Sequence, residues 1–285
     1  MARILIAGCG YVGTALGVRL VTTGHTVWGL CRRTDALPQG IHPLAADLTT
    51  PQTLRGLPPG LEYVFYTAAP DGSSDAAYSA AYGDGLRTLL DTLTGQRQPI
   101  QRFFLTSSTA VYGQSAGEWV DETSPTAPTH FTGLRLLEGE RLLLRGPFPA
   151  TVLRLGGIYG PGRTRLIERM RQGAAVCQKG PPVYINRIHR DDSAGALQHL
   201  MGLPQPDSLY LGVDHEPADL CTVLRWLAAQ LGAPPPRSEA APDPDRQRRR
   251  SNKRASNARL VASGYRFRYP GFREGYAALL AAGGA

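Results

Sequence analysis

RILIAGCGYVG, residues 3–13, is the stretch that decides the fold of this chain. The apolar run from Arg3 to Ala7 predicts a buried strand, and the residues from Tyr11 to Thr23 predict a helix that ends at Gly24. Glycines separate these two elements in the pattern G-x-G-x-x-G. Such a turn between a strand and a helix is typical of a dinucleotide site.

Each glycine of this turn has its own physical role. Gly8 permits the tight turn, Gly10 lets a pyrophosphate approach the backbone, and Gly13 allows the helix to pack closely on the strand. The helix begins at Tyr11 and Val12, so its first N–H groups and its dipole are offered to the phosphates. The alternative interpretation is a glycine-rich turn that holds no ligand.

Two arginines follow the second predicted strand, which runs from His25 to Cys31. A site for NAD usually has an acidic residue here, about 20 residues beyond the glycines, which binds the ribose 2′-hydroxyl. Arg32 and Arg33 can instead bind a 2′-phosphate and stack on adenine. The sequence therefore favours NADP over NAD, unless both arginines are only solvated loop charges.

Two further segments are candidates for cofactor contacts. A third strand predicted at 44–48 carries Asp47 and Leu48, which are placed to contact adenine, although Asp47 could equally cap the next helix. A fourth strand, predicted at 63–69, is almost uniformly apolar, as a strand buried on both faces should be. Its end could pass beside the middle of the cofactor and comprises Ala68, Ala69 and Pro70.

Strands and helices alternate along the chain, which predicts an α/β fold with a doubly wound parallel sheet of the Rossmann type. Further strands are expected at 102–107, 150–155 and 208–213, and further helices at 78–93, 132–144, 193–201, 220–231 and 272–281. Residues 1–155, with 187–213 returning to them, should form the dinucleotide-binding domain. Residues 156–186 and 214–285 should form a smaller substrate-binding region, with a proline-rich loop at 233–244.

Composition narrows the class of protein. The chain has 285 residues, of which 42% are hydrophobic and 19% charged, as in a globular protein. No apolar run reaches the ~18 residues of a membrane span, and glycines follow the first apolar run where a signal peptide would have its cleavage site, so we expect a cytoplasmic protein. Four separate cysteines and scattered histidines predict reduced thiols and no metal site. The net charge of +8 favours anionic partners.

Three more motifs follow the glycine turn in order: TSSTAVYG at 106–113, LRLGGIYGPGR at 153–163 and NRIHRDD at 186–192. With them the chain resembles, from Arg3 to about Asp192, the extended and atypical short-chain dehydrogenase/reductases called NAD-dependent epimerase/dehydratases. Its ending, from Asn252 to Phe272, is similar to that of a bacterial subgroup of uncertain substrate.

The resemblance implies a catalytic arrangement from which this chain departs. Family members use a serine and a Tyr-x-x-x-Lys pair, in which the lysine holds the nicotinamide ribose and lowers the pKa of the tyrosine, the general acid. Ser108 matches the serine, while Phe131 and Arg135 stand at the tyrosine and lysine positions. Phenylalanine has no exchangeable proton, so the usual dehydrogenase mechanism is in doubt while cofactor binding is not.

Other groups could donate the proton instead. The nearest in sequence are Tyr112, Tyr159 and His130, the last of which titrates in a useful range. The alternative is that both tyrosines pack with satisfied hydroxyl groups and that His130 starts a helix.

The resemblance also implies a set of binding residues. Ser107 and Arg135 would contact the cofactor, and the residues expected at the substrate are Ser108, Thr109, Tyr159, Arg163, Asn186 and Arg187. Arginine suits an anionic substrate, such as a nucleotide-sugar pyrophosphate or a carboxylate. Asp191 or Asp192 is expected to cap the following helix.

A strongly basic stretch at 246–254 could bind nucleic acid, but no aromatic residues are interleaved with it. A solvated loop is the preferred interpretation, and part of an anion-binding cleft is the second. The chain is therefore expected to be an NADP- or NAD-dependent oxidoreductase or epimerase-like enzyme. Its substrate would be a small or nucleotide-sugar-type carbonyl or alcohol. The alternative is a catalytically inactive NADP(H)-binding sensor or regulatory protein. Family members often dimerise, which leaves a homodimer open.

Overall fold

The structure is a computed structural model that describes residues 1–240 and 251–283. The chain forms two compact units. The first comprises Met1–Val111, Ala127–Arg154 and Ala194–Tyr210. The second comprises Tyr112–Thr126, Leu155–Ser193 and the described residues from Leu211 onward. This division differs from the predicted domain boundaries at 112–126, 187–193 and 211–213. The predicted substrate-binding role of the second region stays a prediction.

A seven-stranded sheet organises the first unit, in the order β12-β7-β5-β4-β1-β2-β3. The strands are β1 (Arg3–Ala7), β2 (Thr26–Cys31), β3 (Ile41–Ala45), β4 (Tyr63–Tyr66), β5 (Arg102–Ser108), β7 (Ala150–Leu155) and β12 (Leu209–Gly212). The chain moves outward from β1 through β2 to β3, then returns to β4 on the other side of β1. The prediction of a doubly wound parallel sheet is confirmed, and its switch point lies between β1 and β4.

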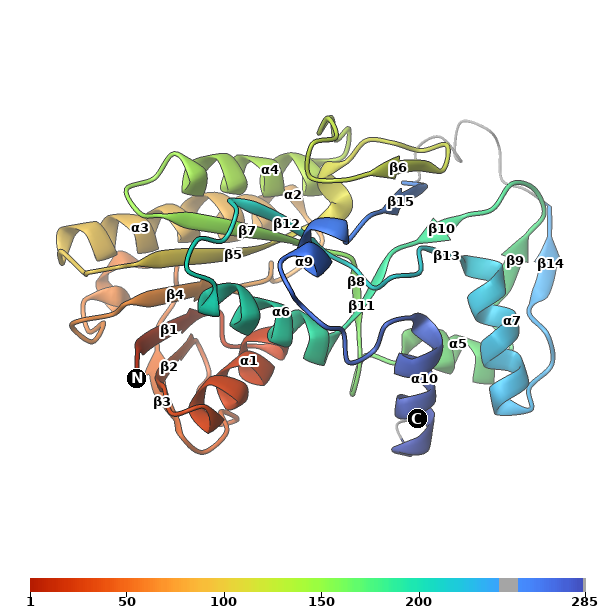
Figure 1. Cartoon of the computed structure of the whole chain (residues 1–285), viewed down its shortest axis with the longest axis horizontal. Helices are drawn as coiled ribbons and strands as arrows, with labels where there is room; N and C mark the ends of the chain where they lie inside the picture. The colour runs from red at the N-terminus through yellow and green to blue at the C-terminus, as the bar shows by residue number, and fades with distance from the viewer. Residues whose placement is uncertain (241–250, 284–285) are drawn as a thin grey trace. The chain divides into compact units, whose positions relative to one another are not determined.

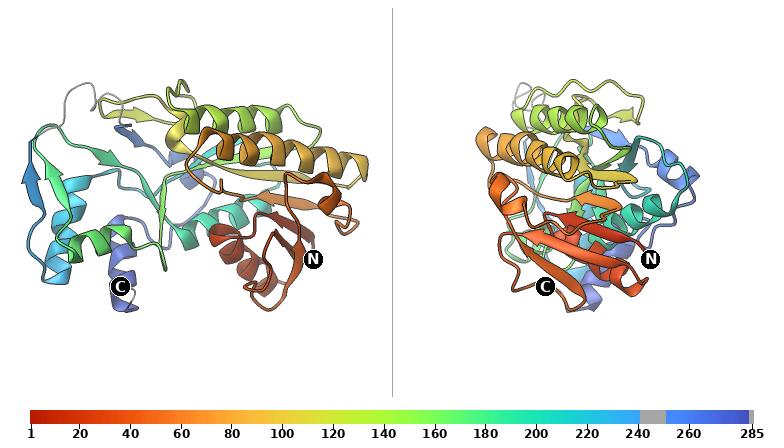
Figure 2. Two further views of the ribbon diagram at one scale, coloured as in Figure 1. Left: turned by 180° about the vertical axis from the view of Figure 1, so that it is seen from behind. Right: turned by 90° about the vertical axis from the view of Figure 1, so that its left-hand side faces the viewer.

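Helices cover both faces of this sheet (Figures 1 and 2). α3 (Gly85–Gly95) and α4 (Phe131–Leu144) lie on one face, and α1 (Tyr11–Thr22) and α6 (Arg190–Gly202) on the other. The strands between them are closed to solvent, with Ile4, Leu5 and Ile6 of β1 all 0% exposed. Burial on both faces explains why β1 and β4 are continuously apolar in sequence.

The third strand was predicted at the wrong residues, because it runs over Ile41–Ala45 and not over 44–48. Ile41 pairs with Val27 and packs over Gly17 and Gly29, so its side chain fixes the register of β3. Pro43 is tolerated because β3 is the edge strand of the sheet.

The helix predicted at 78–93 is interrupted. It begins as α2 (Asp75–Ser79), which Ser74 caps by accepting from the N–H of Ala77. It continues as a π-helical turn, η2 (Ala80–Asp84), before α3. The hydroxyl of Tyr66 donates to the carbonyl of Ala81 at 2.5 Å, and Gly85 lies against the same hydroxyl. This outside donor accounts for the wider turn at that point.

Short strand pairs build the second unit. They are β8 (Gly157–Tyr159) with β11 (Arg187–His189), β6 (Glu118–Val120) with β15 (Lys253–Ala255), β9 (Val176–Gln178) with β14 (Arg237–Glu239), and β10 (Tyr184–Ile185) with β13 (Ala218–Asp219). The helices are α5 (Arg165–Arg171), α7 (Leu220–Leu231), α9 (Ala258–Ala262) and α10 (Phe272–Ala281), and η1 (Pro51–Leu54) and η3 (Thr109–Val111) are 3₁₀ turns of the first unit. Tyr159, Phe272 and Tyr276 belong to the core of the second unit.

Two predictions for this region need correction. The proline-rich segment is not wholly a loop, because β14 pairs with β9 in parallel, while residues 241–244 lie outside the described residues. The basic stretch is not a solvated loop at its end, because Lys253 is buried and the Arg254 guanidinium lies over the rings of Trp119 and Tyr184. Its other arginines, Arg246 and 248–250, lie outside the described residues.

Across residues 1–240 and 251–283, no helix is both long and apolar enough to cross a bilayer. The same residues contain no cluster of three or more histidine, cysteine or acidic side chains arranged to hold a metal ion.

Candidate functional site

The glycine turn of the first unit has the geometry of a phosphate cradle. Gly8 has a φ of +82°, and a Cβ there would lie 2.3 Å from the Cα of Ala68. A Cβ on Gly13 would lie 2.6 Å from Thr67 Oγ1 and 3.0 Å from the carbonyl oxygen of Gly8. A Cβ on Gly10 would meet only that carbonyl oxygen, at 3.9 Å. Gly8 and Gly13 are therefore held by packing, whereas Gly10 leaves open space beside the backbone.

Hydrogen bonds hold the backbone of the turn in place. The N–H groups of Gly8 and Cys9 both donate to the carbonyl oxygen of Leu30 at 2.9 Å. Thr67 Oγ1 donates to the carbonyl oxygen of Gly8 at 2.8 Å. α1 begins at Tyr11 with Gly10 as its N-cap, so no side chain caps this helix end. A helix start of this kind, beside open space, suits the pyrophosphate of a dinucleotide.

Arg32 lies immediately after β2 and is bound to an acidic residue that the sequence analysis did not identify. Its two terminal nitrogens donate to the carboxylate of Asp71 at 2.6 and 2.5 Å. Hydrogen bonding to Asp71 is the main cause that raises the pKa of Arg32. Arg33 is exposed, and its carbonyl oxygen accepts from the thiol of Cys31.

Asp47 stabilises its own turn. Its Oδ1 accepts from the N–H and the hydroxyl of Thr49 at 2.9 and 2.7 Å, and these bonds lower its pKa. Leu48 is half-buried and packs against the core. Ala68 touches the glycine turn, Ala69 is exposed, and Pro70 is half-buried.

A buried ion pair beneath the end of β5 engages Ser107. The Ser107 hydroxyl donates to Glu140 Oε1 at 2.5 Å, and Arg154 donates to the same carboxylate, with Nη2 2.6 Å from Oε2. Glu140 and Arg154 are 2% and 5% exposed. Because its hydroxyl serves Glu140, Ser107 has a structural role that the sequence did not predict. Glu140 thereby ties α4 to β5 and β7.

Ser108, the last residue of β5, is half-buried, and its hydroxyl oxygen accepts from the N–H of Ala110 at 3.2 Å. Thr109 is buried in the 3₁₀ turn that follows. Ser108 thus ends a strand that neighbours β4, one of the two strands at the switch point, and its catalytic role stays a prediction. Thr109 is buried instead.

Phe131 and Arg135, one turn apart on α4, both contact α2. The Phe131 ring meets the Tyr78 ring edge-on, with centroids 5.6 Å apart. Arg135 donates to both carboxylate oxygens of Asp75, at 2.8 and 2.9 Å, and to Glu138 at 2.9 Å. Hydrogen bonds from Arg135 lower the pKa of Asp75. The cation at the lysine position is therefore paired with two acidic residues.

Two of the three alternative proton donors have structural partners, whereas the hydroxyl of Tyr159 lacks the expected hydrogen bond within the part of the chain that the structure describes. His130 is the N-cap of α4 and accepts from the N–H of Thr132, as its structural interpretation predicts. Tyr112, in the second unit, is 2% exposed and donates to the carbonyl oxygen of Asp121 at 2.7 Å.

Tyr159 belongs to the second unit's core, and Arg187 is half-buried on the paired strand β11. Tyr159 is 1% exposed, stacks on Tyr276 at 4.6 Å and has a pKa raised by burial. Among the described residues, Tyr159 Oη, Arg187 Nε and Asp214 Oδ2 are buried without a hydrogen-bond partner. Burial raises the pKa of Asp214 to about 8. Nearby Arg163 is exposed in a turn beside Gly160.

Asn186 does not present a free amide. Its Oδ1 accepts from the N–H of Ala255 at 2.7 Å, and its Nδ2 donates to the carbonyl oxygen of Lys253 at 3.0 Å. The Asn186 side chain therefore forms hydrogen bonds with the backbone of β15, as a neighbouring strand would. The amine of Lys253 donates to the carbonyl oxygen of Tyr112 and to Ser251, and burial lowers its pKa to about 8. The other lysine of the chain, Lys179, is exposed.

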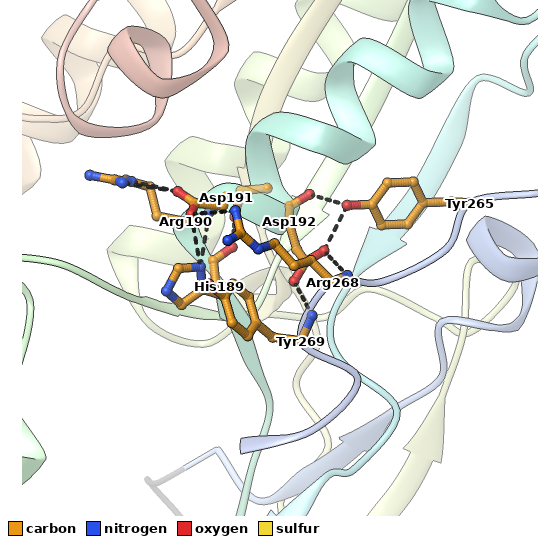
Figure 3. A network of polar contacts seen from close by, with 8 residues as sticks. His189, Arg190, Asp191, Asp192, Tyr265, Arg268 and Tyr269 are labelled. Atoms are coloured by element: carbon orange, nitrogen blue, oxygen red, sulfur yellow. Dashed lines mark hydrogen bonds and ion pairs between the residues drawn. The ribbon is translucent and has the colours of Figure 1, made fainter. Parts of the chain in front are cut away.

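The aspartates of the NRIHRDD motif do not cap α6, which corrects that prediction. Asp192 is 1% exposed and accepts from the hydroxyl of Tyr265 at 2.8 Å and from the N–H groups of Arg268 and Tyr269 at 2.7 and 2.9 Å. Figure 3 shows this network. Asp191 accepts from Arg190 at 3.0 Å. Asp192 therefore anchors the segment that precedes α10.

Several residues around the candidates were not predicted from sequence: the acidic partners Asp71, Asp75, Glu138 and Glu140, and the buried groups Asp214 and Lys253. Glu138 is three residues from Arg135, a helical spacing that could have indicated the pair. Asp71 and Asp75 lie 39 and 60 residues from their arginines, so no local pattern signals them.

A doubly wound α/β sheet with a glycine turn at its switch point is typical of dinucleotide-binding proteins. Residues 4–191 match the profile of the NAD dependent epimerase/dehydratase family, and the chain belongs to that family.

Known proteins are similar to the chain over about three quarters of its length or more. A solved structure from Methylobacillus flagellatus, described as an NAD-dependent epimerase/dehydratase, is 40% identical, covers 99% of this chain and 98% of its own, and has a TM-score of 0.82. Protein YeeZ of Escherichia coli K12 is 29% identical over 74% of this chain and 77% of its own. The human epimerase family protein SDR39U1, solved with NADPH, is 21% identical over 96% and 97% of the chains, with a TM-score of 0.77, which shows a shared fold.

Proposed function

We propose that the protein is an NADP(H)-dependent oxidoreductase or epimerase-like enzyme acting on a small anionic carbonyl or alcohol, such as a nucleotide sugar. One observation carries this proposal: the glycine cradle at the switch point has arginines, and no acidic residue, at the end of β2.

The residues of the first unit fit such a dinucleotide. The open space at Gly10 and the start of α1 would take the pyrophosphate, and Arg32 with Arg33 would take the 2′-phosphate. A bound nicotinamide dinucleotide would supply or accept the hydride. The hydroxyl of Ser108 would bind the substrate oxygen, while Arg163 and Arg187 would favour an anionic substrate. We also propose a cytoplasmic location and a homodimer, which the sequence and the family resemblance suggest.

A second function, an inactive NADP(H)-binding sensor, is favoured by a specific pair of contacts. Phe131 has no exchangeable proton, and Arg135 forms ion pairs with Asp75 and Glu138. This arrangement keeps the dinucleotide cradle and lacks the usual acid on α4.

Calorimetry with NADPH and NADH tests the cofactor site directly. The double variant Arg32→Ala/Arg33→Ala should weaken NADPH binding by about 10- to 100-fold, because charge-assisted hydrogen bonds to the 2′-phosphate are lost. NADH binding should change little. Equal weakening of both cofactors would remove the 2′-phosphate role, and no binding of either to the unchanged protein would remove the dinucleotide site itself.

Turnover separates the enzyme from the sensor. A panel of carbonyl compounds and nucleotide sugars, followed by NADPH absorbance, should give a rate that Ser108→Ala abolishes. Tight NADPH binding with no turnover on the whole panel would favour the sensor.

A further inference from the structure

Arg32 and Asp71 bridge the dinucleotide cradle of the first unit. β1 lies between β2 and β4 in the sheet. Arg32 follows β2, and Asp71 lies in the loop that leaves β4. Their ion pair therefore joins the two strands that flank β1, at the end where the glycine turn begins. The loop that carries Asp71 also carries Ala68, which packs on Gly8.

The Arg32–Asp71 ion pair has the geometry that arginine also uses to bind a phosphate. A guanidinium that offers two parallel N–H groups binds a carboxylate and a phosphate in the same way. Both terminal nitrogens of Arg32 are used by the two oxygens of Asp71, at 2.6 and 2.5 Å. A 2′-phosphate can bind this face of Arg32 only after Asp71 leaves it.

The pair is also easy to break. The two side chains are 59% and 65% exposed, so water replaces each partner at small cost. Exposed ion pairs of this kind shift an equilibrium by about two- to fivefold. Asp71 therefore competes with a ligand without blocking it.

We propose that Asp71 sets the cofactor preference of the cradle, by occupying the bidentate face of Arg32 until the 2′-phosphate of NADP(H) displaces it. NAD(H) has a neutral 2′-hydroxyl, which gains little from Arg32 and leaves the ion pair closed. Asp71 thus weakens NADP(H) binding by competition and leaves NAD(H) binding unaffected. This inference rests on the proposed NADP(H) site.

Asp71→Asn tests the competition, because asparagine keeps the size of the side chain and removes its charge. Calorimetry should show NADPH binding about two- to fivefold tighter than in the unchanged protein, since Arg32 is released from its ion pair. NADH affinity should be unchanged. Asp35→Asn is the matched control, because it removes an equal charge from an exposed residue three positions beyond Arg32, and it should alter NADPH affinity less than twofold.

A double variant identifies the group through which Asp71 acts. In the Arg32→Ala background, Asp71→Asn should have no effect on NADPH binding. An effect that persists without Arg32, or an equal tightening of NADPH and NADH, would overturn the competition while leaving the dinucleotide site intact. Unchanged NADPH affinity in Asp71→Asn would also overturn it. Failure of the unchanged protein to bind either cofactor would overturn the proposed function together with this inference.

Discussion

The carboxyl group of Asp214 is 2% exposed, and burial raises its pKa to about 8. At neutral pH the folded protein therefore keeps a proton on Asp214 that the unfolded chain has released. One of its oxygens accepts from the N–H of Glu216 at 3.1 Å, and the other is without a partner among the described residues. The protonated form is the one that the surroundings of Asp214 tolerate.

This proton makes stability depend on pH. Because the folded-state pKa lies above the unfolded value, the stabilisation is complete at low pH and is lost as pH rises toward about 8. The loss amounts to up to about 1.4 kcal/mol per pH unit. Asp214→Asn, which keeps the contact to Glu216, should remove this dependence. Denaturant unfolding at pH 6.5, 7 and 8 measures the two slopes.

Two other buried groups, His189 and Lys253, also contribute to the pH dependence of stability. His189 has a pKa lowered to about 4 by burial, so between about 4 and its ordinary value of 6.5 its contribution to stability rises with pH and opposes that of Asp214. Lys253, with a pKa lowered to about 8, contributes only above that pH. Parallel slopes for the protein and Asp214→Asn between pH 6.5 and 8 would contradict the prediction.

At the scale of elements, the turn between β1 and α1 contains one glycine that is needed for packing, Gly13, and one that borders the proposed binding space, Gly10. A Cβ on Gly13 would press on Thr67, on Ile6 and on the backbone of Gly8, whereas a Cβ on Gly10 would meet only one oxygen at 3.9 Å. The two glycines are three residues apart and serve different purposes.

Two alanine variants should therefore have different effects. Gly13→Ala should lower the free energy of unfolding by about 1–3 kcal/mol, because the overpacked junction must shift. Gly10→Ala should leave thermal stability nearly unchanged and weaken NADPH binding by at least about tenfold, since the methyl group occupies the approach of the pyrophosphate. Thermal melts and calorimetry on both variants test this. Normal cofactor affinity in a folded Gly10→Ala would contradict it.

Elements with strong local signals were predicted well, and those set by distant contacts were not. β1, α1, β4 and β5 follow from apolar runs and glycines in the sequence. The start of β3 at Ile41 depends on its packing over Gly17, and the π-helical turn depends on Tyr66, which donates to Ala81 from another strand. Such contacts have no periodic signature.

At the scale of the whole molecule, Asp192 connects parts of the second unit that are far apart in sequence. It accepts from Tyr265, Arg268 and Tyr269, which are 73 to 77 residues further along the chain (Figure 3). Backbone N–H groups so bound exchange slowly with solvent, because they open only when the anchor breaks.

Asp192→Asn should loosen this anchor. One carboxylate oxygen becomes an NH₂ group that cannot accept, so a buried N–H loses its partner at a cost of about 1–3 kcal/mol. Hydrogen exchange at Arg268 and Tyr269 should be about 10-fold faster or more. Tyr265→Phe, which removes a single donor, should have a smaller effect. Unchanged exchange at both amides in Asp192→Asn would refute the anchor.

The candidate site shows the same limit of sequence reasoning. The cradle and its arginines were identified because a local motif defines them. The partners of Arg32 and Arg135 came from a separate loop and helix, and only the structure brings Asp71 and Asp75 to them. Ser107 and Asn186 have structural partners for the same reason, since Glu140 and β15 form hydrogen bonds with their polar groups.

Lysine is scarce in this basic chain, which has only Lys179 and Lys253 among its 31 basic residues. Lys253 is 2% exposed and Lys179 is exposed, so the two side-chain amines differ completely in their access to reagents. Among the side-chain amines, an amine-selective reagent will therefore attach a fluorophore or a crosslinker at Lys179, next to β9, and leave Lys253 unmodified. The exposed α-amino group of Met1 will react as well, so the chain can be labelled at two defined points.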